Sequence, residues 1–170
     1  MSTSASAGRR ELKFATIDDL LNEIDRLVAA DRAGQLRTLG SWTAGQILGH
    51  VAAWIDYGYE GYPMKPPPWF IRVILRWRVR KYLHHGGMPS GVRIPGVKEG
   101  TYGTDALSLE EGADRLRRAL RRLQAGEHAP YDSPAFGPMS HDDRIQLNLR
   151  HAELHLSFLQ PSLDRTGAQT

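Results

Sequence analysis

Apolar residues recur at helical spacing in four stretches of the chain, and a polar residue suited to capping a helix precedes each stretch. In the first stretch, Thr16 and Asp19 have the spacing of a capping box. Apolar residues then return every three or four positions from Ile17 to Val28, and Gly34 is suited to end the helix. This pattern predicts an amphipathic helix that buries one apolar stripe.

The other three stretches carry the same signals and predict three further helices. The second begins after Thr43, the third spans 108–126, and the fourth runs from about His141 to Leu159, where Pro161 ends it. Gly45 and Gly49 weaken the second helix, and their small size lets a neighbouring helix approach closely. No stretch alternates apolar and polar residues for long enough to predict a strand. We therefore expect an all-α, antiparallel-like helix bundle.

A long Pro/Gly-rich excursion, residues 62–102, separates the second and third bundle helices. Within it, 69–82 predicts an extra helix of about four turns, which is basic and aromatic. Such a helix could lie on an anionic membrane surface or contact nucleic acid. Its apolar residues nearly encircle the helix, so we favour packing onto the bundle or onto a partner chain.

Composition predicts one domain at 11–162, with disordered tails at 1–10 and 163–170. The chain has 170 residues and a modest net charge of +3, and it lacks a run of 18 apolar residues. We therefore expect no membrane insertion and no nucleic-acid binding, while dimerisation through the bundle helices is compatible with the sequence.

There are no cysteines, which excludes disulfides and thiolate ligands and makes the reducing cytoplasm the expected compartment. Any thiol chemistry would need a thiol brought in by a small molecule.

Two histidines in the fourth helix, His151 and His155, stand four residues apart and therefore share one face. Both lie among apolar residues, where an imidazole without a hydrogen-bond partner costs on the order of 1–3 kcal/mol. A shared divalent cation would satisfy both, and His50 in the second helix could supply a third nitrogen. Three imidazoles with an open coordination position are the ligand set of a catalytic metal. Nitrogen donors suit zinc, nickel, iron or copper.

The residues around His151 and His155 limit the kind of metal-dependent catalysis that the site could perform. Ala152 occupies the position where zincins carry their general base, and Glu153 is turned about 100° away, so zincin chemistry does not fit. Asn148, one turn before His151, could orient a ligand, bind substrate or make a packing hydrogen bond. The remaining histidines lie in loops or at helix ends, and we interpret them as surface residues: His84, His85, His128 and His141.

Three blocks of sequence resemble the DinB-like (DinB/YfiT) superfamily, and more closely an uncharacterised subfamily of metal-binding four-helix bundles within it. The blocks are 39–50, 133–140 and 151–159, and the resemblance extends over about 12–161. It implies a four-helix bundle in which His50, His151 and His155 bind a divalent metal, often zinc or nickel. Characterised relatives are metal-dependent transferases or isomerases that use bacillithiol, mycothiol or glutathione.

The resemblance implies a divalent-metal-dependent transferase that joins a low-molecular-weight thiol to a small electrophilic substrate. Such thiols usually carry carboxylates, which arginine binds in a bidentate manner. Arg76 in the excursion and Arg150 beside the first ligand are therefore candidate substrate-binding residues, and the alternative for each is a place on a solvated face. Asn148 is the third candidate. The alternative is a non-enzymatic protein whose metal reinforces the bundle or senses metal availability. A fourth protein ligand would favour that structural role, whereas bound water would favour catalysis.

Overall fold

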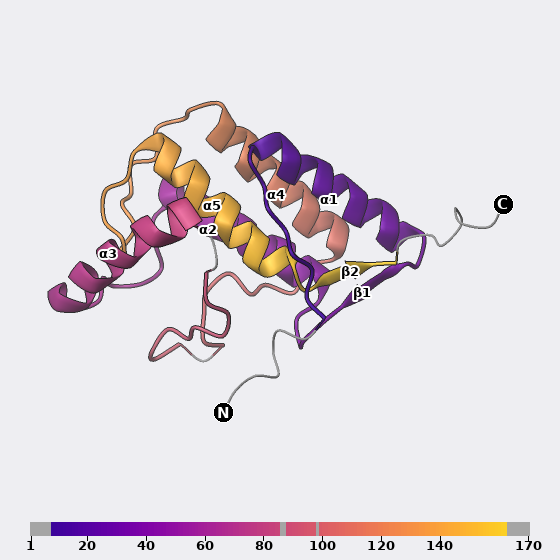
Figure 1. Cartoon of the computed structure of the whole chain (residues 1–170), viewed down its shortest axis with the longest axis horizontal. Helices are drawn as coiled ribbons and strands as arrows, with labels where there is room; N and C mark the ends of the chain where they lie inside the picture. The colour runs from indigo at the N-terminus through magenta and orange to yellow at the C-terminus, as the bar shows by residue number, and fades with distance from the viewer. Residues whose placement is uncertain (1–7, 86–87, 98, 163–170) are drawn as a thin grey trace.

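The structure is a computed structural model that describes residues 8–85, 88–97 and 99–162. The tails expected at 1–10 and 163–170 lie outside these residues, apart from 8–10, and so do the side chains of His84 and His85. The described chain is mostly helical, as predicted (Figure 1). Its elements, in order, are α1 (Ile17–Arg32), β1 (Leu36–Thr38), α2 (Ala44–Glu60), α3 (Trp69–His85), α4 (Leu109–Gln124), α5 (His141–Leu156) and β2 (Leu159–Pro161).

The predicted helix starts are confirmed by the capping geometry. Thr16, Thr43 and Ser108 each accept a hydrogen bond from the third residue of the helix that follows, whose side chain bonds back to complete the capping box. Ser140 caps α5 by accepting from the backbone N–H of Asp143. These caps satisfy backbone N–H groups that have no partner inside the helix, and they fix where each helix begins.

The closest helix packing is between α2 and α4, and glycine makes it possible. A Cβ added at Gly112 of α4 would lie 2.6 Å from the backbone oxygen of Gly45 in α2. A Cβ added at Gly49 would lie 2.7 Å from Leu107 Cδ1. The predicted close approach of a neighbouring helix is therefore confirmed at Gly45, whereas Gly49 meets Leu107, which precedes α4.

One hydrophobic core lies between α1, α2, α4 and α5. Leucines from all four helices are fully buried in it: Leu20, Leu27, Leu48, Leu116, Leu120, Leu149 and Leu156. The sequence pattern missed Glu23, which is 9% exposed on the buried side of α1 and binds Arg10 at 2.7 Å and Arg26 at 2.9 Å. Because Arg10 also donates its backbone N–H to the oxygen of Ser157, this residue belongs to the folded domain rather than to a tail.

The predictions of a strand-free chain and of a fourth helix reaching Leu159 are wrong. Helix α5 ends at Leu156, and β2 then pairs antiparallel with β1, with Leu36 opposite Pro161 and Thr38 opposite Leu159. The backbone N–H of Leu39 bonds to the oxygen of Phe158 at 2.9 Å, which draws the chain away from the helix axis. Strands of three residues are too short to show an alternating pattern, so their pairing left no signal in the sequence.

Helix α3 packs against α5 and extends away from the other helices at one end of the molecule (Figure 1). It runs three residues beyond the expected end at Tyr82. Among the α3 side chains that the structure describes, Val79 is buried, and Leu75 and Leu83 are half-buried. None of the described helices has the length and apolar content that crossing a lipid bilayer requires.

Candidate metal centre

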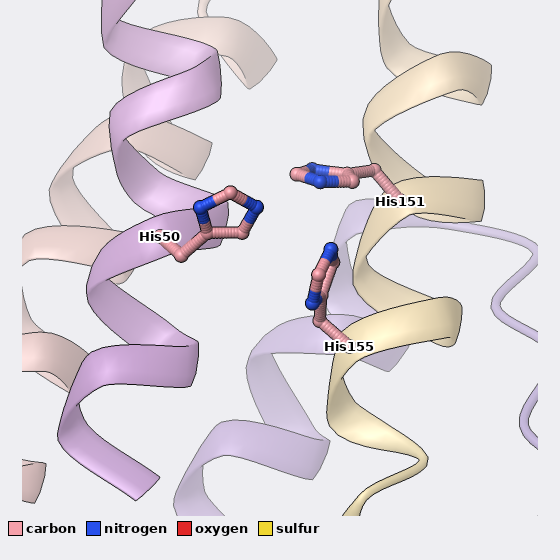
Figure 2. Close-up of side chains that lie close together, drawn as sticks. All are labelled: His50, His151 and His155. Atoms are coloured by element: carbon pink, nitrogen blue, oxygen red, sulfur yellow. The ribbon is translucent and has the colours of Figure 1, made fainter. Parts of the chain in front are cut away.

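Three histidines from two helices point toward one another in the space between α2 and α5 (Figure 2). The ring centroid of His50 lies 5.1 Å from that of His151 and 4.5 Å from that of His155. The two α5 rings are 4.6 Å apart. One nitrogen from each ring can be chosen so that all three lie within 4.8 Å of one another. This group could hold a metal ion, and it brings together residues about a hundred positions apart.

The local sequence explains why the rings converge. The spacing of four between His151 and His155 puts both side chains on the face of α5 that meets α2. His50 lies in the middle of α2, whose close packing against α4 fixes its position. Its side chain is 2% exposed, whereas His151 and His155 are half-buried.

The backbone of the excursion fixes the orientation of His50. Its Nδ1 lies 2.9 Å from the carbonyl oxygen of Tyr102. A carbonyl oxygen can only accept, so Nδ1 carries the hydrogen and Nε2 keeps its lone pair. Metal-binding histidines have this arrangement, because the hydrogen bond at one nitrogen fixes the tautomer and aims the other nitrogen at the metal.

Sequence reasoning missed Tyr102, because a backbone carbonyl has the same chemistry in every residue. The sequence signal for this contact lay in the next residue, Gly103. Gly103 has a φ of +72°, and a Cβ added there would lie 2.6 Å from the Cβ of Ala53 in α2. Glycine at 103 therefore lets the excursion approach α2 closely enough for the carbonyl to reach His50.

Burial keeps the three imidazoles neutral. It lowers the pKa of His50 from 6.5 to about 4, although the Tyr102 hydrogen bond acts in the opposite direction. Burial, and then the charge of His50, lowers the pKa of His155 to about 3. The pKa of His151 is also well below its ordinary value, first through burial and then through the other two histidines. At neutral pH all three rings have the lone pairs that a metal requires.

Two tryptophans form aromatic walls around the cluster. Trp42 stacks on His155 with centroids 5.8 Å apart and an interplanar angle of 6°, and it meets His50 edge-on at 5.0 Å. Trp54 lies edge-on to His50 at 6.1 Å and to His151 at 6.0 Å. Both tryptophans are half-buried, and Trp42 also packs against the hydrophobic core. The two side chains therefore serve both the core and the histidine cluster.

The donor set is that of a site with open coordination positions. Within the described ranges, the group of potential ligands consists of the three histidines, with no carboxylate among them. A structural zinc site is closed by four protein ligands, whereas three leave room for an exogenous one.

A family model for proteins of unknown function, DUF1569, matches residues 6–162. The chain belongs to the DUF1569 family. No curated protein and no solved structure matches it. The region matched by the DUF1569 model contains all three histidines and Tyr102.

The contacts of the other predicted site residues in this DUF1569 chain lie away from the imidazoles. Arg150 is 8% exposed, pairs with Glu153 at 2.8 Å, and donates to the backbone oxygen of Phe14. Asn148 donates to the backbone oxygen of Arg144 at 2.9 Å, one turn back along α5. These contacts tie α5 to itself and to the segment that precedes α1.

Arg76, the third predicted substrate-binding residue, and Glu153, which follows Ala152 in α5, also contact other parts of the chain. The guanidinium of Arg76 covers Gly137, because a Cβ added at 137 would lie 2.7 Å from its Cζ. Glu153 accepts from the backbone N–H of Phe14 at 2.6 Å. Its carboxylate therefore holds the segment before α1 in place.

Proposed function

We propose that this protein binds one divalent transition metal through His50 Nε2 and one ring nitrogen each of His151 and His155. The observation that carries the proposal is that three imidazoles converge so that one nitrogen of each lies within 4.8 Å of the other two, with no carboxylate in the group among the described residues. The carbonyl of Tyr102 aims the first of them. All-nitrogen donors favour zinc or nickel over magnesium or calcium.

The fold that we infer is a four-helix bundle of the DinB-like type. Helices α1, α2, α4 and α5 would be its members, and α3 would be an addition between the second and third. Contacts of α2 with α4 and α5, and of α1 with α4 and α5, support this arrangement. The histidines lie on the second and fourth of these helices, where the sequence resemblance expects the metal ligands.

The activity that we propose is transfer of a low-molecular-weight thiol to a small electrophile. A bound divalent metal would favour the thiolate over the thiol of a small molecule at the open position. The chain has no cysteine, so the sulfur must come from a co-substrate. In this reaction the sulfur forms a bond to carbon, the bond from that carbon to its leaving group breaks, and the thiol proton departs with the leaving group. Trp42 and Trp54 would limit the access of water to the ligands.

Cobalt substitution tests for the open position. The full chain is freed of metal, loaded with Co²⁺, and titrated with glutathione, bacillithiol and mycothiol while its absorption spectrum is recorded. We expect at least one thiol to produce a sulfur-to-cobalt charge-transfer band. Substitution of His155 by Ala should abolish this band, while substitution of His141 by Ala, an exposed histidine at the start of α5, should preserve it.

Turnover is tested by mass spectrometry of conjugates formed from a panel of electrophiles. We expect conjugates to form faster with metal-loaded wild type and with the His141→Ala variant than with His155→Ala. A loaded protein with an invariant cobalt spectrum and no thiol-dependent conjugation would refute the transferase. The bound metal would then have a purely structural role in the protein.

A further inference from the structure

One side of α3 exposes large apolar side chains to solvent. Trp69 is 76% exposed and Trp77 is 75% exposed. Three residues between them, Phe70, Val73 and Ile74, are 53–59% exposed. The spacing of these five residues puts them on one side of the helix, and we call them the apolar stripe.

The stripe is mostly exposed to solvent, and two of its own members, Trp69 and Phe70, meet edge-on. Helix α3 contacts α5 through its other side, which contains the buried Val79 and the half-buried Leu75 and Leu83. Helix α3 thus has two apolar sides, one packed on α5 and one exposed. For this reason apolar residues occur all around the helix. Contiguous apolar surface of this kind marks a site where a protein meets a partner or a membrane.

The charge around the stripe defines the chemistry of the partner. Residues 61–98 contain no acidic residue and eight basic ones. The rest of the chain has 14 basic and 19 acidic residues, so positive charge is concentrated in this segment. Arg76, Arg78 and Lys81 are exposed on α3 itself. The partner should therefore combine negative charge with an apolar layer.

We propose that α3 docks on the surface of a membrane rich in anionic phospholipid, with the apolar stripe inserted at the level of the headgroups. Tryptophan is well suited to this depth, because its ring is apolar and its N–H can reach water. Basic side chains beside the stripe would contact the lipid phosphates, and each contributes about 1 kcal/mol near such a surface. Helix α3 would lie in the plane of the interface, as amphipathic surface helices do.

Charge and polarity argue against two other occupants. A second copy of the chain would place one segment of eight basic residues and no acidic residue against another. A nucleic acid would satisfy the basic residues, but its phosphates would face five apolar side chains. A bilayer interface satisfies both the charge and the stripe.

Sedimentation with vesicles tests the proposal on the full-length protein. The vesicles are phosphatidylcholine alone or phosphatidylcholine mixed with phosphatidylglycerol. We expect binding to the anionic vesicles, weak binding to the neutral ones, and a loss of affinity as salt is raised. Tryptophan emission should shift to shorter wavelength when anionic vesicles are added, and this shift should be lost when Trp69 and Trp77 are both replaced by Phe.

Matched pairs of substitutions distinguish the effect of basic residues on α3 from the effect of the overall net charge. Arg78→Glu with Lys81→Glu should weaken binding to anionic vesicles by at least about thirtyfold, which corresponds to two lost basic contacts. Arg118→Glu with Arg121→Glu changes the net charge by the same amount on an exposed part of α4 and should leave binding nearly unchanged. Trp69→Ser with Trp77→Ser should weaken binding by about tenfold or more. Circular dichroism checks that each variant is folded.

Four outcomes would overturn the proposal. The first is equal loss of binding in the α3 pair and the α4 pair. The second is no sedimentation with anionic vesicles at low salt. The third is a wild-type dimer in analytical ultracentrifugation that Trp69→Ser with Trp77→Ser converts to a monomer without any vesicle binding, because the stripe would then join two copies. The fourth is binding to duplex DNA in place of vesicles, which would assign the surface to nucleic acid.

Discussion

The histidine cluster places polar side chains between packed helices, whereas the apolar stripe of α3 places apolar side chains in water. His50 is 2% exposed and has a pKa lowered by burial, while Trp77 is 75% exposed. Each region has side chains in an environment that costs free energy in the isolated chain. The missing partner differs accordingly: a cation for the imidazoles and an anionic, partly apolar surface for α3.

The two regions also differ in how firmly the rest of the chain holds them. The imidazoles are in contact with two helices, two tryptophans and the carbonyl of Tyr102. The stripe has no comparable support, because α3 packs through its opposite side. Substitutions near the cluster should therefore change stability and metal affinity, whereas substitutions in the stripe should change binding to other molecules alone.

Acidification should produce the largest change in the free energy of unfolding, and it should act through the histidine cluster. The unfolded chain protonates His50 below about pH 6.5, while the folded chain does so near pH 4. Stability from this residue is therefore fully present above pH 6.5 and is lost as the pH falls to 4, a change of about 3 kcal/mol. Urea unfolding of the metal-free protein at several pH values measures it. His50→Phe should show a smaller loss and Trp77→Ser the same loss as wild type. Identical pH dependence in all three would contradict the assignment.

Two arginines provide the next comparison. Arg150→Ala removes the partner of the half-buried Glu153 and of the backbone oxygen of Phe14. Breaking a buried pair in this way should lower the free energy of unfolding by about 3 kcal/mol. Arg78→Ala, on the exposed side of α3, should change it by less than about 0.5 kcal/mol. Denaturant unfolding measures both, and equal effects would show that Arg150 does not hold the segment before α1.

Two glycines test the role of the Tyr102 carbonyl. Gly103→Ala places a methyl group against Ala53 and should displace the carbonyl from His50. Metal affinity should then fall about 10- to 100-fold, as expected when the hydrogen bond that orients a ligand is lost. Gly91 is the matched control, because it also has a positive φ, of +75°, but a Cβ there would meet nothing within 4 Å. Competition with a chelator gives the affinities, and equal losses in the two variants would refute the role of Tyr102.

The smallest effect on stability should come from the apolar stripe. Trp77→Ser should change the free energy of unfolding by no more than about 0.5 kcal/mol, because the side chain makes little contact with the fold. Metal affinity should be unchanged. A destabilisation of about 2 kcal/mol would mean that Trp77 packs within the chain, and the contrast between the two regions would fail.

Local sequence signals were sufficient for the starts of α1, α2, α4 and α5 and for the histidine pair of α5. Capping residues at Thr16, Thr43 and Ser108 act within one turn, so their effect can be read directly from spacing. The pair in α5 was visible for the same reason. Its convergence with His50 required the packing of α2 on α5, which the resemblance to metal-binding bundles implied.

Features that depend on contacts between distant segments of the chain could not be predicted from the sequence. The carbonyl of Tyr102, the pairing of β1 with β2 and the buried position of Glu23 all depend on segments that meet only in the folded chain. Periodicity in α3 also failed to show which side is buried, because both of its sides are apolar. The interpretation that the helix packs on the body is confirmed for the Val79 side alone.

Elemental analysis shows whether His50, His151 and His155 bind a divalent metal. Wild type, His151→Ala and His141→Ala are purified, loaded with zinc or nickel, freed of loosely bound ions and measured by mass spectrometry. We expect about one metal ion per chain in wild type and in His141→Ala, and a large loss of metal in His151→Ala. Equal metal content in all three proteins, or none in loaded wild type, would contradict this expectation.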